Sequence, residues 1–172
     1  MTPPAAVPTT DRPAEQTVEQ TVEQRTDLPV VASPRTLHVL GNTLELLVEG
    51  RQSPRASVVR YTVAPGFTAP PTLHHHVADD VTMTVLDGAL VVTGLAGDVP
   101  VRAGETLVLR HGTPFAWRNA SAEEPAVYLA VYAPGGFEEY FVAVADALAA
   151  GSALTPELLG PLWNRFGIAV SE

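Results

Sequence analysis

The chain has 172 residues, which is enough for one domain with a hydrophobic core. Its formal net charge of −9 argues against a nucleic-acid partner, because such a partner requires a basic surface. It has no cysteine and its ten basic residues are all arginine, which excludes disulfides, thiolate chemistry and lysine Schiff bases.

Residues 1–35 are rich in Pro, Thr, Glu and Gln and contain a short duplication, TVEQ at 17–20 and at 21–24. This composition offers too little apolar surface to offset the entropy lost on ordering, so we expect a disordered tail. The alternative is an arm that docks on a partner, because Val18 and Val22 are spaced to share a helix face. The segment also lacks the features of a secretory signal, and no run of the chain is long and apolar enough to span a membrane. We therefore expect a cytoplasmic protein with no membrane partner.

From Thr36 onward the sequence changes to short apolar runs separated by turn residues, a pattern typical of an all-β sandwich or barrel. Pro65-Gly66, Asp87-Gly88 and Ala103-Gly104 are among the predicted turns. The predicted strands are 36–39, 44–49, 56–63, 81–86, 89–93, 99–102, 106–110, 115–119 and 126–133.

Two helices are predicted after the strand region. Four apolar residues share one face of the first: Phe137, Phe141, Val144 and Leu148. The second is predicted from Thr155, as N-cap before Pro156, to Phe166. We expect both helices to pack over the barrel as a lid or flank. The predicted organisation is a disordered tail (1–35), a barrel (36–134) and a C-terminal helical segment (135–172).

Two motifs in the barrel region identify a family resemblance. The first, PGFTAPPTLHHHVADDVTMTVLDG, runs from Pro65 to Gly88, and the second, GETLVLRHGTPFAWRN, runs from Gly104 to Asn119. In these motifs the sequence resembles the cupin superfamily, and more closely the small bacterial cupins similar to quercetin dioxygenase. The resemblance covers roughly residues 36–167. It implies a double-stranded β-helix, or jelly-roll barrel, and a homodimer.

The resemblance also implies a metal site, which this sequence alters. Cupins of this kind hold a metal with a His-x-His pair, a glutamate and a third histidine, and these positions correspond here to His74, His76, Val81 and Phe115. A catalytic metal normally needs about three protein ligands, and Val81 and Phe115 supply none. We therefore expect no metal cofactor. If a metal is bound, His74, His76 and either Asp79 or Asp80 are its predicted ligands.

The same motifs predict the residues of a cavity. If His74 and His76 face the barrel interior, strand alternation predicts that Met83, Phe115 and Trp117 face it too. The predicted catalytic residues are His74 and His76, and the predicted substrate-binding residues are Met83, Phe115, Trp117, Arg60 and Tyr128.

Three functions remain open on this evidence. The first is a metal-independent cyclase or isomerase that acts on a hydrophobic, aromatic or polyketide-like substrate in natural-product biosynthesis, because imidazoles in an apolar cavity can transfer protons. The second, implied by the resemblance, is a metal-dependent quercetinase-like dioxygenase. The third is a cupin that binds a small molecule without catalysis.

Overall fold

The computed structural model describes residue 30 and residues 33–69 and 73–171. Contacts divide the chain into two units, residues 1–30 and 31–172, and the fold described below is that of the second unit. The tail predicted over residues 1–35 lies almost wholly outside the described residues, so it stays a prediction.

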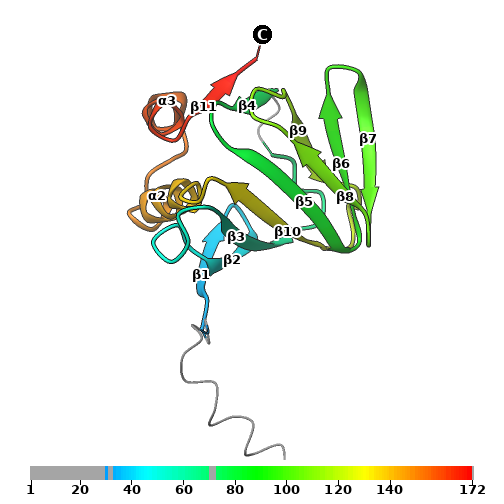
Figure 1. Cartoon of the computed structure of the whole chain (residues 1–172), viewed down its shortest axis with the longest axis horizontal. Coiled ribbons are helices and arrows are strands. Elements are labelled where there is room, and N and C mark those ends of the chain that lie inside the picture. The colour runs from blue at the N-terminus through cyan, green and yellow to red at the C-terminus, as the bar shows by residue number, and fades with distance from the viewer. Residues whose placement is uncertain (1–29, 31–32, 70–72, 172) are drawn as a thin grey trace, which may run out of the picture. The chain divides into compact units, whose positions relative to one another are not determined.

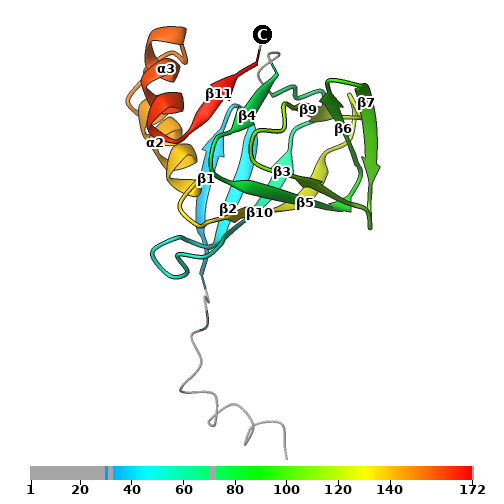
Figure 2. The same ribbon diagram turned by 45° about the horizontal axis from the view of Figure 1, so that its top comes forward.

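The second unit is built mainly from antiparallel strands. Six of them form a sheet in the order β1-β2-β3-β10-β5-β8, three form a sheet in the order β7-β6-β9, and β4 pairs with β11 (Figure 1). The strands are β1 (Arg35–Val39), β2 (Asn42–Val48), β3 (Ser57–Val63), β4 (His74–His76), β5 (Asp80–Asp87), β6 (Ala89–Gly94), β7 (Gly97–Arg102), β8 (Thr106–Leu109), β9 (Ala116–Asn119), β10 (Ala126–Ala133) and β11 (Ile168–Val170). The two described helices, α2 (Glu138–Ala149) and α3 (Pro156–Arg165), lie on the same side of the sheets (Figure 2).

Alternate residues of the central strands point into a shared core, as the two-residue period of a strand requires. The buried residues are Ser57, Val59, Tyr61 and Val63 on β3, and Ala126, Tyr128, Ala130 and Tyr132 on β10. The two rows pair in register, with Tyr61 opposite Tyr128. The predicted all-β barrel with C-terminal helices is therefore confirmed.

All nine predicted strands are present within two residues of their predicted bounds, but the sequence did not predict β4 and β11. Both have three residues, too short for alternation to be visible. They exist because they pair with each other, with His76 opposite Ile168 and His74 opposite Val170. Phe115, the predicted first residue of β9, instead makes an isolated bridge with His74.

Both predicted helices are present. The predicted apolar face of α2 packs on the core, where Phe137 and Val144 are buried and Phe141 and Leu148 are partly buried. Thr155 is at the N-cap of α3 in extended backbone, but its side chain makes no capping hydrogen bond. Neither α2 nor α3 has the length and apolar character needed to cross a bilayer.

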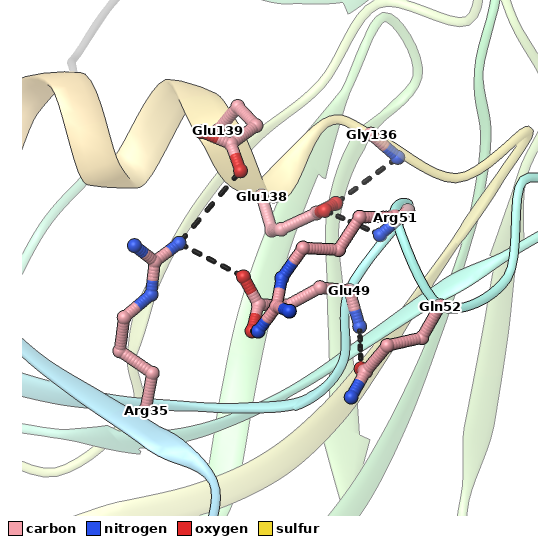
Figure 3. Close-up of polar contacts among 8 residues, drawn as sticks. Arg35, Glu49, Arg51, Gln52, Gly136, Glu138 and Glu139 are labelled. Atoms are coloured by element: carbon pink, nitrogen blue, oxygen red, sulfur yellow. Dashed lines mark hydrogen bonds and ion pairs between the residues drawn. The ribbon is translucent and has the colours of Figure 1, made fainter.

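Buried carboxylates tie the start of α2 to the loop after β2 (Figure 3). Glu138, which is 1% exposed, accepts hydrogen bonds from the backbone N–H groups of Gly50 and Gly136, the latter at 3.0 Å. Gly50 must lack a side chain, because a Cβ there would lie 2.7 Å from the Gly136 nitrogen. Glu49, also buried, accepts from Arg35 at 3.0 Å and from Arg51 at 2.7 Å. These contacts set the position from which α2 begins.

The arginines beside Glu49 predict a pH dependence of stability. The hydrogen bond from Arg51, with Arg35 nearby, lowers the pKa of Glu49 below its ordinary 4.5 although burial opposes this. A depressed folded-state pKa contributes stability above the unfolded pKa, and the contribution is lost as the pH falls through the folded value. We expect Glu49→Gln to flatten the loss of unfolding free energy between about pH 5 and pH 3, measured by urea unfolding. Parallel curves for the variant and the wild type would rule out this role for Glu49.

Candidate functional site

A cavity of about 480 Å³ lies among the inward faces of the strands and the C-terminal segment. Strands β1, β2, β3, β4, β5, β9 and β10 contribute to its walls, and so do α2, α3 and β11. No arginine, aspartate or glutamate among the described residues lines it. A concave apolar space with a few polar groups is the usual form of a small-molecule site.

The two predicted catalytic histidines lie in the wall of this cavity on β4. His76 is buried, and its Nδ1 lies 3.6 Å from Oδ2 of Asp79, which is beyond hydrogen-bond distance. The ring of His74 packs against Phe115, with their centroids 4.6 Å apart. His75 points to the other face, where its Nδ1 lies 3.1 Å from the Ser171 hydroxyl. Strand alternation thus separates the central histidine from the pair.

Backbone pairing on both sides holds this histidine strand in place. β11 pairs with one edge, and Phe115 bridges the other through two hydrogen bonds with His74, of 3.0 and 2.8 Å. The pairing continues just after β4, where the Val77 N–H donates to the Gly167 carbonyl of the C-terminal segment at 2.8 Å. The imidazoles therefore project from a strand fixed along its length.

The residues around the histidines do not make up a metal centre of the usual kind. Val81 and Phe115, at the positions of the missing ligands, both line the cavity. Asp80 is directed elsewhere: its Oδ1 accepts from the His111 backbone N–H at 2.8 Å and lies 2.9 Å from the His111 ring, and these contacts lower its pKa. Within residues 33–69 and 73–171, no three His, Asp or Glu side chains are grouped closely enough to hold a metal ion. Asp79 is the carboxylate that lies within ion-pair distance of His76, with Oδ2 3.6 Å from Nδ1.

Tyrosine hydroxyls are further polar groups of the cavity, which Asn42 and Thr68 also line. The Tyr61 and Tyr132 oxygens are 2.7 Å apart in a buried hydrogen bond, and Tyr128 stacks on Tyr61 with ring centroids separated by 4.5 Å. Burial raises the pKa of all three tyrosines, so these hydroxyls keep their protons at physiological pH. Tyr132 lies beside His76, with ring centroids 5.9 Å apart.

Most of the predicted binding residues line the cavity, and one does not. Met83, Phe115, Trp117 and Tyr128 are in its wall. Arg60 is on the opposite face of β3, where its Nε donates to Glu45 at 2.6 Å, so its predicted place in the pocket is wrong. The reason is strand parity, because Val59 and Tyr61 on either side of it point inward.

Sequence reasoning missed part of the wall. Tyr61 faces the cavity from β3, and Phe137, Tyr140 and Trp163 face it from the C-terminal segment. The alternation of Val59, Tyr61 and Val63 was a usable signal for Tyr61. Of the other three, Phe137 was predicted only on the packing face of the first helix, and Tyr140 and Trp163 were not among the predicted site residues. Periodicity does not distinguish a core from a cavity.

This arrangement can bind an uncharged, mainly apolar molecule and exchange a proton with it. The aromatic walls supply contact area, the imidazoles supply a proton acceptor and donor, and the tyrosines supply neutral hydrogen-bond donors.

Part of the sequence matches the model of a known protein family. Residues 59–132 match the model of the cupin domain. Among curated proteins, none matches the sequence.

Solved structures share the fold at low sequence identity. A sugar phosphate isomerase from Silicibacter pomeroyi is 20% identical, with a TM-score of 0.52 over 62% of this chain and 75% of that one. Pac13, a nucleoside dehydratase from Streptomyces, is 21% identical, with a TM-score of 0.52 over 66% of this chain and 88% of that one. A predicted oxalate decarboxylase from Thermotoga maritima is 20% identical, with a TM-score of 0.52 over 62% of this chain and 99% of that one.

Proposed function

We propose that this chain, whose residues 59–132 match the cupin domain model, is a metal-independent enzyme of the cyclase or isomerase type. Its substrate is a hydrophobic small molecule, aromatic or polyketide-like, of the kind found in natural-product biosynthesis. One observation carries the proposal: two imidazoles lie in an otherwise apolar cavity, with Val81 and Phe115 at the positions where a metal site needs ligands.

The proposed chemistry is proton transfer. One imidazole removes a proton from a carbon activated by a neighbouring carbonyl, and the proton is returned at a second position, so the double bond moves without net oxidation. An aromatic cavity lowers the barrier further by holding a flexible substrate in one reactive conformation. In this scheme Asp79 is a positioning residue that favours one orientation of the His76 ring.

The cavity wall supports an uncharged substrate. A sugar phosphate or a dicarboxylate requires a cationic partner inside a site of this kind. Of the described arginines, none reaches the cavity, and the chain has no lysine. The substrates named for two of the structurally similar proteins therefore do not suit this cavity.

The second candidate is a quercetinase-like dioxygenase. It is favoured by the 3.6 Å separation between His76 and Asp79, which leaves His74, His76 and Asp79 as a potential ligand set after a shift of the turn. A binding cupin without catalytic activity is the third candidate. The homodimer implied by the family resemblance also stays a prediction.

Metal content separates the first two candidates. The purified protein is expected to hold far less than one transition metal per chain, measured by elemental analysis, and to retain any co-purified ligand through chelator treatment. Mass spectrometry of that ligand would identify the substrate class. One equivalent of metal that is lost in the His74→Ala or His76→Ala variant would replace the isomerase proposal with the dioxygenase.

A further inference from the structure

We propose that the Tyr61 and Tyr132 hydroxyl pair is the site that binds an oxygen of the substrate. The inference deepens the proposed function and rests on it. It assigns the polar end of the ligand, a carbonyl or a similar uncharged acceptor, to a defined pair of side chains.

The number of O–H donors in the tyrosine cluster indicates that a ligand oxygen binds there. Each hydroxyl carries one proton, and the 2.7 Å contact between the two oxygens uses one of them. Tyr61 also hydrogen-bonds with the Tyr128 hydroxyl, so three hydroxyls with three protons make two contacts, and one O–H group is left over in the cavity wall. Including the stacked Tyr128 does not remove the surplus, because that hydroxyl brings a proton of its own. Buried donors in folded proteins are nearly always satisfied, and a ligand oxygen would satisfy this one.

The state of the tyrosines defines the chemistry of the partner. Because burial raises their pKa values, the hydroxyls are neutral donors, and the neighbouring negative charges of Asp79 and Glu138 raise the pKa of Tyr132 further. A neutral donor in an apolar wall binds an acceptor such as a ketone or ester oxygen. A phosphate or carboxylate would find no arginine or lysine among the described wall residues.

The pair is also placed to act on the bound carbonyl. The Tyr132 ring neighbours the His76 ring at 5.9 Å, so an oxygen on the hydroxyl pair brings the adjacent carbon toward the imidazole. When that carbon loses its proton to the imidazole, the C–H electron pair forms a C=C bond and the carbonyl π pair moves onto oxygen. The O–H donor stabilises the resulting negative charge, as a preorganised donor does at a developing oxyanion.

The dimensions of the cavity allow a simple probe. A cavity of about 150 Å³ holds one benzene, so the present 480 Å³ has room for a two-ring compound. The ketone β-tetralone and the hydrocarbon tetralin differ only in the carbonyl oxygen. The chain has two tryptophans, Trp117 and Trp163, and both line the cavity, so their fluorescence reports binding there.

The test compares the two compounds on wild type and on the Tyr61→Phe/Tyr132→Phe double variant. Wild type is expected to bind β-tetralone roughly three- to tenfold more tightly than tetralin, the usual range for one net hydrogen bond. The double variant is expected to lose this preference and keep its affinity for tetralin. Removing both hydroxyls together eliminates the 2.7 Å bond without leaving either of its two members unpaired, so the variant should fold, as circular dichroism would verify. Infrared spectra should show the bound carbonyl stretch at lower frequency in wild type than in the double variant.

The matched control is Thr84→Val/Thr106→Val, which removes a hydroxyl pair 3.0 Å apart on β5 and β8 that does not line the cavity. Its preference for the ketone should equal that of wild type. A preference that persists in the Tyr61→Phe/Tyr132→Phe variant, or that disappears in Tyr140→Phe, whose hydroxyl is the other donor in the cavity wall, would overturn the inference while leaving the proposed function standing. If neither compound binds wild type, the apolar-ligand proposal fails together with the inference.

Discussion

Replacing His76 with alanine is expected to slow proton exchange on a bound ketone by roughly 10²-fold or more, the usual contribution of a positioned general base. The protein should catalyse exchange of the α-protons of β-tetralone in deuterium oxide, a reaction that needs proton transfer and neither metal nor redox chemistry. His76 is buried, lies beside Tyr132 and lines the cavity, so its removal takes away a base placed next to the bound ketone. The exchange rate is measured directly by proton NMR. The same loss is expected for His74→Ala if the two imidazoles share the transfer.

His75 provides the internal control for this experiment. It is adjacent to both imidazoles in sequence, on the same strand, but its ring faces Ser171 and it does not line the cavity. We expect His75→Ala to retain the wild-type exchange rate. Equal losses in all three histidine variants would indicate damage to β4 and not removal of a base. A wild-type protein that binds the ketone and exchanges no protons would refute the proton-transfer proposal.

Replacing Glu138 with alanine is expected to reduce the free energy of unfolding by about 3–5 kcal/mol, which is roughly 10 °C in melting temperature for a chain of this size. The substitution strips the Gly50 and Gly136 N–H groups of the acceptor that the buried Glu138 carboxylate supplies. Each hydrogen bond to a charged group is stronger than a neutral one, and each buried donor left unpaired adds a penalty. Glu138→Gln should lie between alanine and wild type, because the amide retains one acceptor and sets an NH₂ group against the other N–H.

The neighbouring Glu139 is the matched control. Its carboxylate is half exposed and lies 3.7 Å from Arg35, so Glu139→Ala should change the unfolding free energy by less than about 1 kcal/mol. Chemical denaturation of both variants gives the comparison. If Glu138→Ala were as stable as Glu139→Ala, the loop after β2 would not depend on this carboxylate. Phe137 directly precedes Glu138, and its ring centroid lies 4.2 Å from that of His76. A shift of the start of α2 would therefore move the cavity wall, so the Glu138 variants should also weaken ligand binding.

Several site residues were predictable because strand geometry is a local property. Met83 lies two residues from Val81 on β5, and Trp117 lies two from Phe115, so each shares the face of a motif position. The same rule, applied to Val59 and Tyr61, excludes Arg60 from the cavity. Arg60 was misplaced because its charge was considered without its parity in the strand.

Local pattern did not determine which aspartate accompanies the histidines. Asp79 and Asp80 are adjacent in sequence and chemically identical, and both were candidates. Asp80 begins β5 and is held by the His111 turn, which leaves Asp79 near His76. That outcome depends on how two turns meet, and neither turn alone contains the information.

By itself the sequence determined the barrel, its two C-terminal helices and the apolar character of the interior, because alternation, turn residues and helical spacing are properties of neighbouring residues. The tertiary structure alone decided the polar features of the site. Tyr61 and Tyr132 are 71 residues apart and meet because β3 and β10 pair in one register, while β4 is a strand only because β11 returns to pair with it. A hydrogen bond requires its two atoms within about 3 Å, and that condition depends on the placement of whole strands, which no local pattern encodes.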